Sequence, residues 1–204
     1  MKHLISAIIL TLTLSHLASA QVVEPVKHTT SRQQVTVQVS GVVTRKVTDS
    51  GLTYKPTSTG GALVGYRFNI NRWLGVEGEY DFFRNSQKYS STDTSYALRT
   101  NVHAATGAVV INIPNPLTKR IKSFASVGGG ALLFDPRDTD LIQRQFKSTI
   151  VIGGGMDLPI TRHIAFRAQA KTFLYKAPDF AVSGLATNKY VQTMVPSAGV
   201  VFNF

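Results

Sequence analysis

The chain has 204 residues and no cysteine, so it offers no disulfide, no thiolate metal ligand and no cysteine for lipid attachment. Its formal charge of +11 would suit a nucleic-acid-binding protein, but lysine and arginine are spread along the chain, which disfavours that class. A surface that faces anionic lipid head groups accounts better for this charge.

The N-terminus has the three parts of a secretory signal peptide. Met1–His3 is a short basic start, residues 4–14 are apolar apart from Ser and Thr, and Ala18–Ala20 has the small–x–small pattern of a cleavage site. We therefore predict a signal peptide over residues 1–20. Residues 21–33 are polar and show no periodicity, so we expect a flexible periplasmic lead-in. No later apolar run is long enough for a membrane-spanning helix.

From residue 34 the chain divides into segments of alternating hydrophobicity separated by turn residues. In the clearest of them, Leu74, Val76 and Tyr80 alternate with Glu77 and Glu79. The predicted strands, in chain order, are 34–45, 60–70, 74–83, 96–113, 123–134, 148–159, 164–176 and 193–204. The connections after every second strand are short, whereas the others, at 46–59, 84–95, 135–147 and 177–192, are longer and polar.

The last predicted strand ends on an aromatic residue. Phe204, Phe202 and Val200 fall on one face, and Asn203 falls on the other. An exposed apolar strand end favours aggregation in a soluble protein. A transmembrane barrel instead pairs its last strand with its first and turns the apolar face towards lipid.

These features resemble the eight-stranded bacterial outer-membrane barrels of the OmpA/OmpX type. The resemblance implies an all-β fold, an eight-stranded antiparallel up-and-down transmembrane barrel over residues 34–204, in the outer membrane of a Gram-negative-type bacterium. It also implies that Phe202 and Phe204 form an assembly signal and that Trp73 lies at the membrane interface. Because the sequence stops at the barrel, we expect no peptidoglycan-binding domain of the kind that some relatives append.

Charged residues on the predicted inner face are expected to pair, because an isolated buried ion is far costlier than a paired one. Pairing across the turn at 71–73 puts Arg67 opposite Glu77, so exchanging these two charges should recover part of the stability that either single change removes. The predicted lumen ion-pair network consists of Arg67, Glu77, Glu79, Arg99, Asp157, Arg167 and Lys171.

Two further pairs in this network depend on the register of later hairpins. A hairpin centred near Tyr89 places Glu79 opposite Arg99, and the turn at 160–163 places Asp157 diagonal to Arg167. The favoured interpretation of the network is a structural polar plug that fixes strand register. A gated or narrow polar conduit is the alternative.

Two glycine triplets, Gly128–Gly130 and Gly153–Gly155, are about equidistant from the middle of the loop between them, so we expect them to lie opposite each other. Neither precedes Lys-Ser/Thr or opens a helix, which disfavours a phosphate-binding loop. Their expected role is to let the wall bend or to admit large inward side chains.

Three histidines lie outside the signal peptide, namely His28, His103 on an expected inner face, and His163 at a turn. None has a carboxylate or a second histidine at ligand spacing, and none forms a nucleophile–base pair with a serine. We therefore predict no metal site, no cofactor and no enzymatic activity.

The sequence thus predicts a small integral outer-membrane barrel with an envelope-structural or surface-interaction role through its extracellular loops. A general diffusion pore is not expected, because eight strands leave no aqueous channel. The expected partners are outer-membrane lipid and lipopolysaccharide, the barrel-assembly machinery, periplasmic chaperones and an unidentified extracellular ligand, but not nucleic acid. Two alternatives stay open, a soluble lipocalin-like ligand-binding barrel with its apolar face inward and a lipid-modifying outer-membrane enzyme.

Overall fold

The computed structural model describes residues 32–49, 51–91, 95–114, 121–137, 143–182 and 189–204. The predicted signal peptide over residues 1–20 and nearly all of the lead-in lie outside the described residues. In the part of the chain that is described, no helix is long and apolar enough to cross a membrane.

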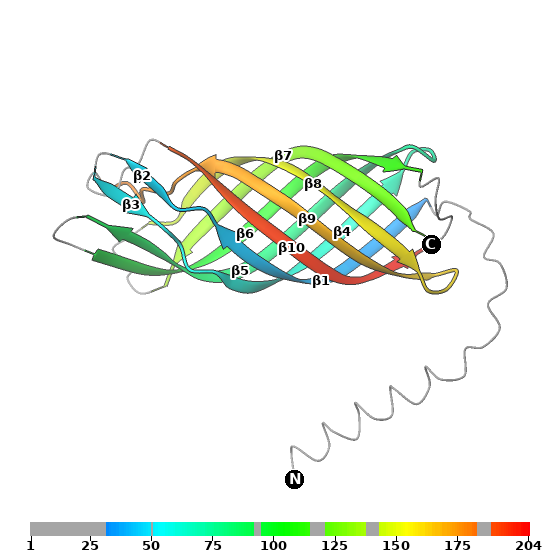
Figure 1. Cartoon of the computed structure of the whole chain (residues 1–204), viewed down its shortest axis with the longest axis horizontal. Helices are drawn as coiled ribbons and strands as arrows, with labels where there is room; N and C mark the ends of the chain where they lie inside the picture. The colour runs from blue at the N-terminus through cyan, green and yellow to red at the C-terminus, as the bar shows by residue number, and fades with distance from the viewer. Residues whose placement is uncertain (1–31, 50, 92–94, 115–120, 138–142, 183–188) are drawn as a thin grey trace, which may run out of the picture.

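Eight long strands form a closed antiparallel barrel, in which each strand pairs with the next and β1 closes on β10 (Figure 1). The predicted all-β, up-and-down barrel is therefore confirmed. Its strands are β1 (Gln33–Thr44), β4 (Thr59–Asn69), β5 (Leu74–Ser90), β6 (Ser95–Ile113), β7 (Lys122–Pro136), β8 (Gln145–Pro159), β9 (Ile164–Lys176) and β10 (Tyr190–Asn203).

The two ends of the barrel differ in their connections. At one end, which we call the turn end, β4 joins β5 and β8 joins β9 through tight turns, and the C-terminus lies there as well (Figure 1). Asn71 Oδ1 accepts hydrogen bonds from the N–H groups of Trp73 and Leu74, both at 2.8 Å, and Thr161 Oγ1 accepts from Ile164 N–H at 3.0 Å. Side-chain acceptors of this kind stabilise short turns.

At the opposite end, which we call the loop end, several strands run further than the sequence pattern predicts, and β5 has the longest extension. β5 and β6 stay paired as far as Ser90 and Ser95, so the predicted strand end at residue 83 is wrong. The predicted loop at 46–59 also contains a hairpin of β2 (Val47–Asp49) and β3 (Leu52–Tyr54), which pairs with β5. The extension of β5 beyond residue 83 and the β2–β3 hairpin are both polar on the outer face. They therefore lack the apolar alternation by which the other strands were predicted.

The outer face of the barrel is apolar. Large hydrophobic side chains on it are between about a third and three quarters exposed, whereas the alternate positions on each strand are buried inside. A lipocalin has the opposite arrangement, so the lipocalin-like alternative is not favoured. The outward residues include Val37, Val39, Val43, Val64, Tyr66, Phe68, Val76, Tyr80, Val109, Ile111, Val127, Ile150, Ile152, Met156, Leu158, Phe166, Met194, Val200 and Phe202.

Candidate functional site

The first ion pair of the lumen lies on the β4–β5 hairpin. Arg67 is directly opposite Glu77, and Arg67 Nη2 lies 2.8 Å from Glu77 Oε2. Both side chains are almost completely buried. This is the register expected from the turn at 71–73, because Ile70 N–H donates to Leu74 O at 2.9 Å and closes that turn.

Arg167 on β9 is the centre of the network. It is fully buried and makes two hydrogen bonds to Asp157, from Nε at 2.6 Å and from Nη2 at 2.8 Å. Its Nη1 also lies 3.0 Å from Glu77 Oε1 on the far wall, and further hydrogen bonds reach Gln34 and Thr36 on β1. Asp157 lies directly opposite Arg167 and not diagonal to it, which corrects the expected register of the β8–β9 hairpin by two residues.

A second group of charges lies on the same two walls, nearer the loop end. Lys171 Nζ lies 2.7 Å from Glu79 Oε2 and 2.7 Å from Asp81 Oδ2, and Gln169 Nε2 donates to Glu79 Oε1 at 2.9 Å. Asp81 and Gln169 were missed in the sequence, although each is two residues from a predicted member of the network and so shares its face. Across both groups, every carboxylate has at least one cationic partner.

Phe124 on β7 packs against both buried guanidinium groups. The Cζ atoms of Arg67 and Arg167 lie 4.0 Å and 4.8 Å from the centroid of its ring. Such contacts stabilise a desolvated cation. A Cβ atom on Gly155 would come within 2.8 Å of the ring, so this inward glycine leaves the space that Phe124 occupies.

Arg99 does not belong to the lumen network, and the prediction that it faces Glu79 is wrong. Glu79 is opposite Thr106, and Arg99 is opposite Ser86 on the exposed outer face. The β5–β6 hairpin is longer than assumed, and the pairing shifts by an odd number of residues, which moves a side chain to the opposite face.

The same shift places His103 on the outer face instead of the inner one. Its Nδ1 lies 2.6 Å from the hydroxyl of Tyr80, and its ring centroid is 5.1 Å from that of Phe82. His163 at the turn end contacts Asn203 O through Nδ1 at 3.3 Å. Among the described residues, no group of three or more His, Asp or Glu is arranged to hold a metal ion.

The two glycine triplets are not opposite each other. Gly128–Gly130 pairs with residues 149–151, and Gly153–Gly155 pairs with residues 124–126. The equal distance of the two triplets from the middle of the loop does not determine how β7 and β8 pair. The pairing depends on how their side chains and backbones pack against the neighbouring strands. A Cβ atom on Gly128 would lie 2.0 Å from the carbonyl oxygen of Gly107, so the close approach of β6 and β7 requires glycine there.

The half of the lumen nearer the loop end is filled by apolar and aromatic side chains. They form one buried cluster, which we call the apolar plug, and the sequence analysis missed it. Its signal was present in consecutive apolar residues near strand ends, such as residues 132–134 and 173–175, where both faces are apolar. The plug includes Val42, Phe83, Val102, Ala104, Leu132, Phe134, Val151, Phe173, Tyr175, Val191 and Val195.

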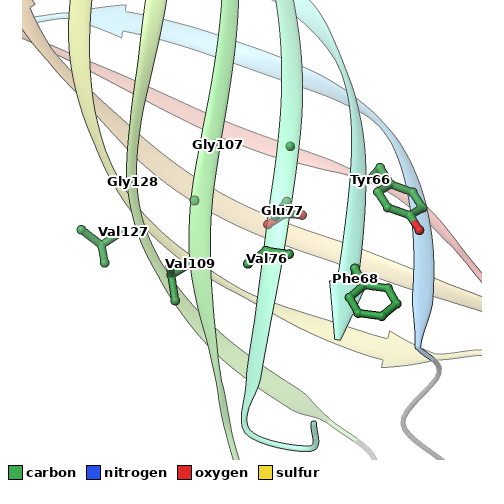
Figure 2. A pocket seen from close by; sticks show the side chains of 10 residues that line it. Tyr66, Phe68, Val76, Glu77, Gly107, Val109, Val127 and Gly128 are labelled. Atoms are coloured by element: carbon green, nitrogen blue, oxygen red, sulfur yellow. The ribbon is translucent and has the colours of Figure 1, made fainter. Parts of the chain in front are cut away.

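A hollow of about 470 Å³ lies on the outer wall over β4 to β7 (Figure 2). Its floor contains Gly78 and Gly107, which are directly opposite each other and whose missing Cβ atoms would meet nothing within 4 Å. Figure 2 shows the apolar side chains around it, namely Tyr66, Phe68, Val76, Val109 and Val127. We call this feature the glycine hollow.

The sequence matches the outer membrane protein beta-barrel domain family over residues 6–204, almost the whole chain. The chain belongs to this family. It is accordingly an outer-membrane protein of the Gram-negative type, and its apolar outer face is the surface that meets lipid. In such barrels the short turns are periplasmic and the long loops extracellular, so the turn end is the periplasmic end and the loop end is the extracellular end.

Solved structures show the same fold at low sequence identity. OprG from Pseudomonas aeruginosa has a TM-score of 0.60 at 11% identity, over 85% of this chain and 96% of that one. Neisserial surface protein A has a TM-score of 0.59 at 12% identity, over 85% and 98% of the two chains. AlkL, determined in lipid bilayers, has a TM-score of 0.54 at 9% identity, over 91% and 96%. No curated protein sequence matches this chain.

The extracellular mouth of this outer-membrane barrel is capped by aromatic residues from three segments. Tyr54 on β3 and Tyr89 on β5 are fully buried, with ring centroids 5.1 Å apart. The hydroxyl of Tyr89 donates to Pro178 O at 2.5 Å, which ties β5 to the segment that follows β9. Phe180 in that segment is also buried, with a φ of 50° that residues other than glycine rarely adopt.

A polar contact secures the same segment to β8. Gln145 Nε2 donates to Asp179 Oδ1 at 2.5 Å, and this hydrogen bond lowers the pKa of the Asp179 carboxyl below its ordinary value. Gln145 Oε1 in turn accepts from the N–H groups of Asp179 and Phe180. The described extracellular segments are therefore joined to one another by specific contacts.

Proposed function

We propose that this outer-membrane barrel acts by interaction at its extracellular surface and has neither a general diffusion pore nor an enzymatic activity. The observation that carries the proposal is the contrast between a filled lumen and the specific contacts that join the described extracellular segments. The apolar plug and the ion-pair network occupy the interior. β5 and β6 extend beyond Phe82, the last aromatic residue on the outer face of β5, and β5 pairs with the β2–β3 hairpin.

The charge of this end indicates the chemistry of the partner. Lys46, Lys55 and Lys88 are exposed there, and Lys55 N–H donates to Lys88 O at 2.9 Å, which brings the last two residues together. Among the described extracellular residues, basic side chains outnumber the acidic residues Asp49, Asp135 and Asp179. An anionic polymer outside the cell is therefore the partner class that this surface fits best.

Neutralising the three lysines tests this interaction. We expect the Lys46→Gln/Lys55→Gln/Lys88→Gln barrel in nanodiscs to bind fluorescent dextran sulfate about tenfold more weakly, at about 0.5 kcal/mol for each exposed charge. The effect should shrink as salt screens the charges. Arg72→Gln at the periplasmic end is the matched control and should bind as the wild type does. Equal binding by the triple variant would refute the proposed surface.

Planar-bilayer recordings test the absence of a pore. We expect no large, steady conductance, because the side chains of the apolar plug fill the lumen and eight strands leave little space inside. The Phe173→Ala variant, which removes a fully buried plug residue, should conduct more than the wild type if the plug is the barrier. A porin-like conductance of the wild-type barrel would contradict the proposal.

We also propose that the barrel-assembly machinery recognises Phe204. Phe204 N–H donates to Gln33 O at 3.0 Å and the residue is 73% exposed, so the hydrogen bond lost on deletion is worth about 1 kcal/mol and little buried surface is lost. We expect the deletion variant to refold in detergent nearly as well as the wild type, but to insert poorly into the outer membrane of cells. Equal insertion in cells would show that the ring is not a signal.

A further inference from the structure

Three arginines that are distant in the sequence meet on the outer wall of the barrel. Arg84 on β5, Arg99 on β6 and Arg137 after β7 line one pocket of about 400 Å³. Strand pairing brings them together, because Ser86 is opposite Arg99 and Arg137 N–H donates to Arg99 O at 2.9 Å. We call this feature the arginine pocket.

The arginine pocket lies at the extracellular border of the lipid-facing surface. Arg84 is two residues beyond Phe82, the last aromatic side chain on the outer face of β5, and its Cζ lies 5.6 Å from the centroid of that ring. Further along β5 the outer face is polar, with Ser86 and Lys88. The pocket is therefore at the depth where lipid head groups begin.

The charge of the pocket suits an anion. Its other lining residues are neutral, namely Thr57, Asn85, Ser86, Thr100 and Asn101. Asp135, which the register places opposite Asn101, is engaged by Arg144 at 2.7 Å. Asn101 is only 7% exposed although it belongs to the outer face, so the pocket also offers a recessed amide. Planar guanidinium groups bind phosphate with paired hydrogen bonds, which makes arginine the preferred residue for such anions.

The glycine hollow lies on the same strands, below the arginine pocket. Gly107 is paired with both Gly78 and Gly129, so three outward glycines form a row across β5, β6 and β7. Gly78 and Arg84 are six residues apart on β5, which corresponds to about 20 Å along the strand. A lipid whose head group occupies the pocket would thus extend an acyl chain over the hollow.

We propose that this wall binds a phosphorylated glycolipid of the outer leaflet, of the lipid A kind, with a phosphate in the arginine pocket and an acyl chain over the glycine hollow. The outer leaflet presents phosphate groups at the depth of the pocket and hydrocarbon at the depth of the hollow. Tyr80 and His103, joined by their 2.6 Å contact, lie between the two regions on the outer face. The lysines of the proposed extracellular surface, Lys46, Lys55 and Lys88, lie beyond the arginine pocket and do not line it.

The test uses the full barrel in phosphatidylcholine nanodiscs, with added lipid A quantified by native mass spectrometry. We expect the Arg84→Gln/Arg137→Gln variant to bind lipid A at least about tenfold more weakly than the wild type, because two charge-assisted contacts are lost. Lys176→Gln on β9 is the control on the opposite wall and should bind as the wild type does. Retention of the fold is checked by the shift in gel mobility on boiling. Equal binding by the arginine variant would overturn the proposal.

Two further experiments ask whether the phosphate must belong to a lipid and whether the acyl chain contributes to binding. Dephosphorylated lipid A should bind as weakly as the arginine variant, and inorganic pyrophosphate should compete poorly. Efficient competition by pyrophosphate would overturn the lipid assignment in favour of a free anion.

Gly107→Leu fills the hollow and should weaken lipid A binding several-fold. Unchanged binding would overturn the placement of the acyl chain over the hollow. Dextran sulfate binding should be the same in Gly107→Leu as in the wild type, which separates this site from the proposed extracellular surface.

Discussion

Replacing Arg167 with methionine is expected to lower the free energy of unfolding of the barrel by about 3–5 kcal/mol, the cost of breaking a buried ion pair by removing one partner. The change removes the guanidinium that makes two hydrogen bonds to Asp157, which is 5% exposed, and takes one of two cations from Glu77. Methionine preserves much of the side-chain volume, so the loss reports on charge and hydrogen bonding more than on a cavity.

The measurement is urea unfolding of the barrel refolded in detergent or lipid vesicles, followed by the gel shift on boiling. Lys46→Met is the control, because Lys46 is exposed and the substitution removes the same charge. The Arg167→Met/Asp157→Asn double variant should be more stable than Arg167→Met alone, since it removes the buried carboxylate charge that has lost its hydrogen-bonded guanidinium. A loss below about 1 kcal/mol for Arg167→Met would mean that the network contributes no more than an exposed pair.

The structure changes the expected result of exchanging the charges of Arg67 and Glu77. The local register predicts recovery, because the two residues face each other. Glu77 also contacts Arg167, however, with Oε1 at 3.0 Å from Nη1. An arginine at position 77 would therefore lie against Arg167, as it also would in the Glu77→Arg single variant. We expect the Arg67→Glu/Glu77→Arg variant to be more stable than Glu77→Arg, because the net charge of the group is restored, but to remain well below the wild type. Full recovery in the double variant would show that Arg167 can turn away from position 77.

Gly128→Ala is expected to prevent refolding or to destabilise the barrel by more than the roughly 1–3 kcal/mol of ordinary overpacking. The new Cβ atom would lie 2.0 Å from Gly107 O and 2.5 Å from the Cα atom of Ala108, and both are backbone atoms of the neighbouring strand. No change of rotamer relieves a clash of Cβ with backbone, so β6 and β7 must separate locally.

Gly107→Ala on the neighbouring strand is the matched control. Its Cβ atom would meet nothing within 4 Å, and the residue lies beside Gly128 in the β6–β7 ladder. We expect this variant to unfold at the same urea concentration as the wild type. Equal stability of the Gly128→Ala and Gly107→Ala barrels would show that the wall yields at Gly128 without cost.

Features that depend on neighbours along the chain could be predicted from the sequence. Alternation with a period of two places Val76 and Tyr80 on one face and Glu77 and Glu79 on the other, whatever the strand pairs with. A short turn also sets its own register, which is why Arg67 could be matched with Glu77 before the fold was known. Both features are local. The barrel was predicted from the apolar last strand, the alternation of short and long connections and the resemblance to outer-membrane barrels.

Features that depend on the lengths of long loops and on closure of the barrel became apparent in the three-dimensional structure. The β5–β6 hairpin is longer than its hydrophobic pattern suggests. Arg99 therefore lies on the outer face, beside Arg84 and Arg137, and not in the lumen. Closure brought Lys171 on β9 to Asp81 on β5, across the lumen and 90 residues apart in the chain. The energy of these contacts depends on packing between opposite walls, and periodicity within a strand contains no information about which walls will face each other.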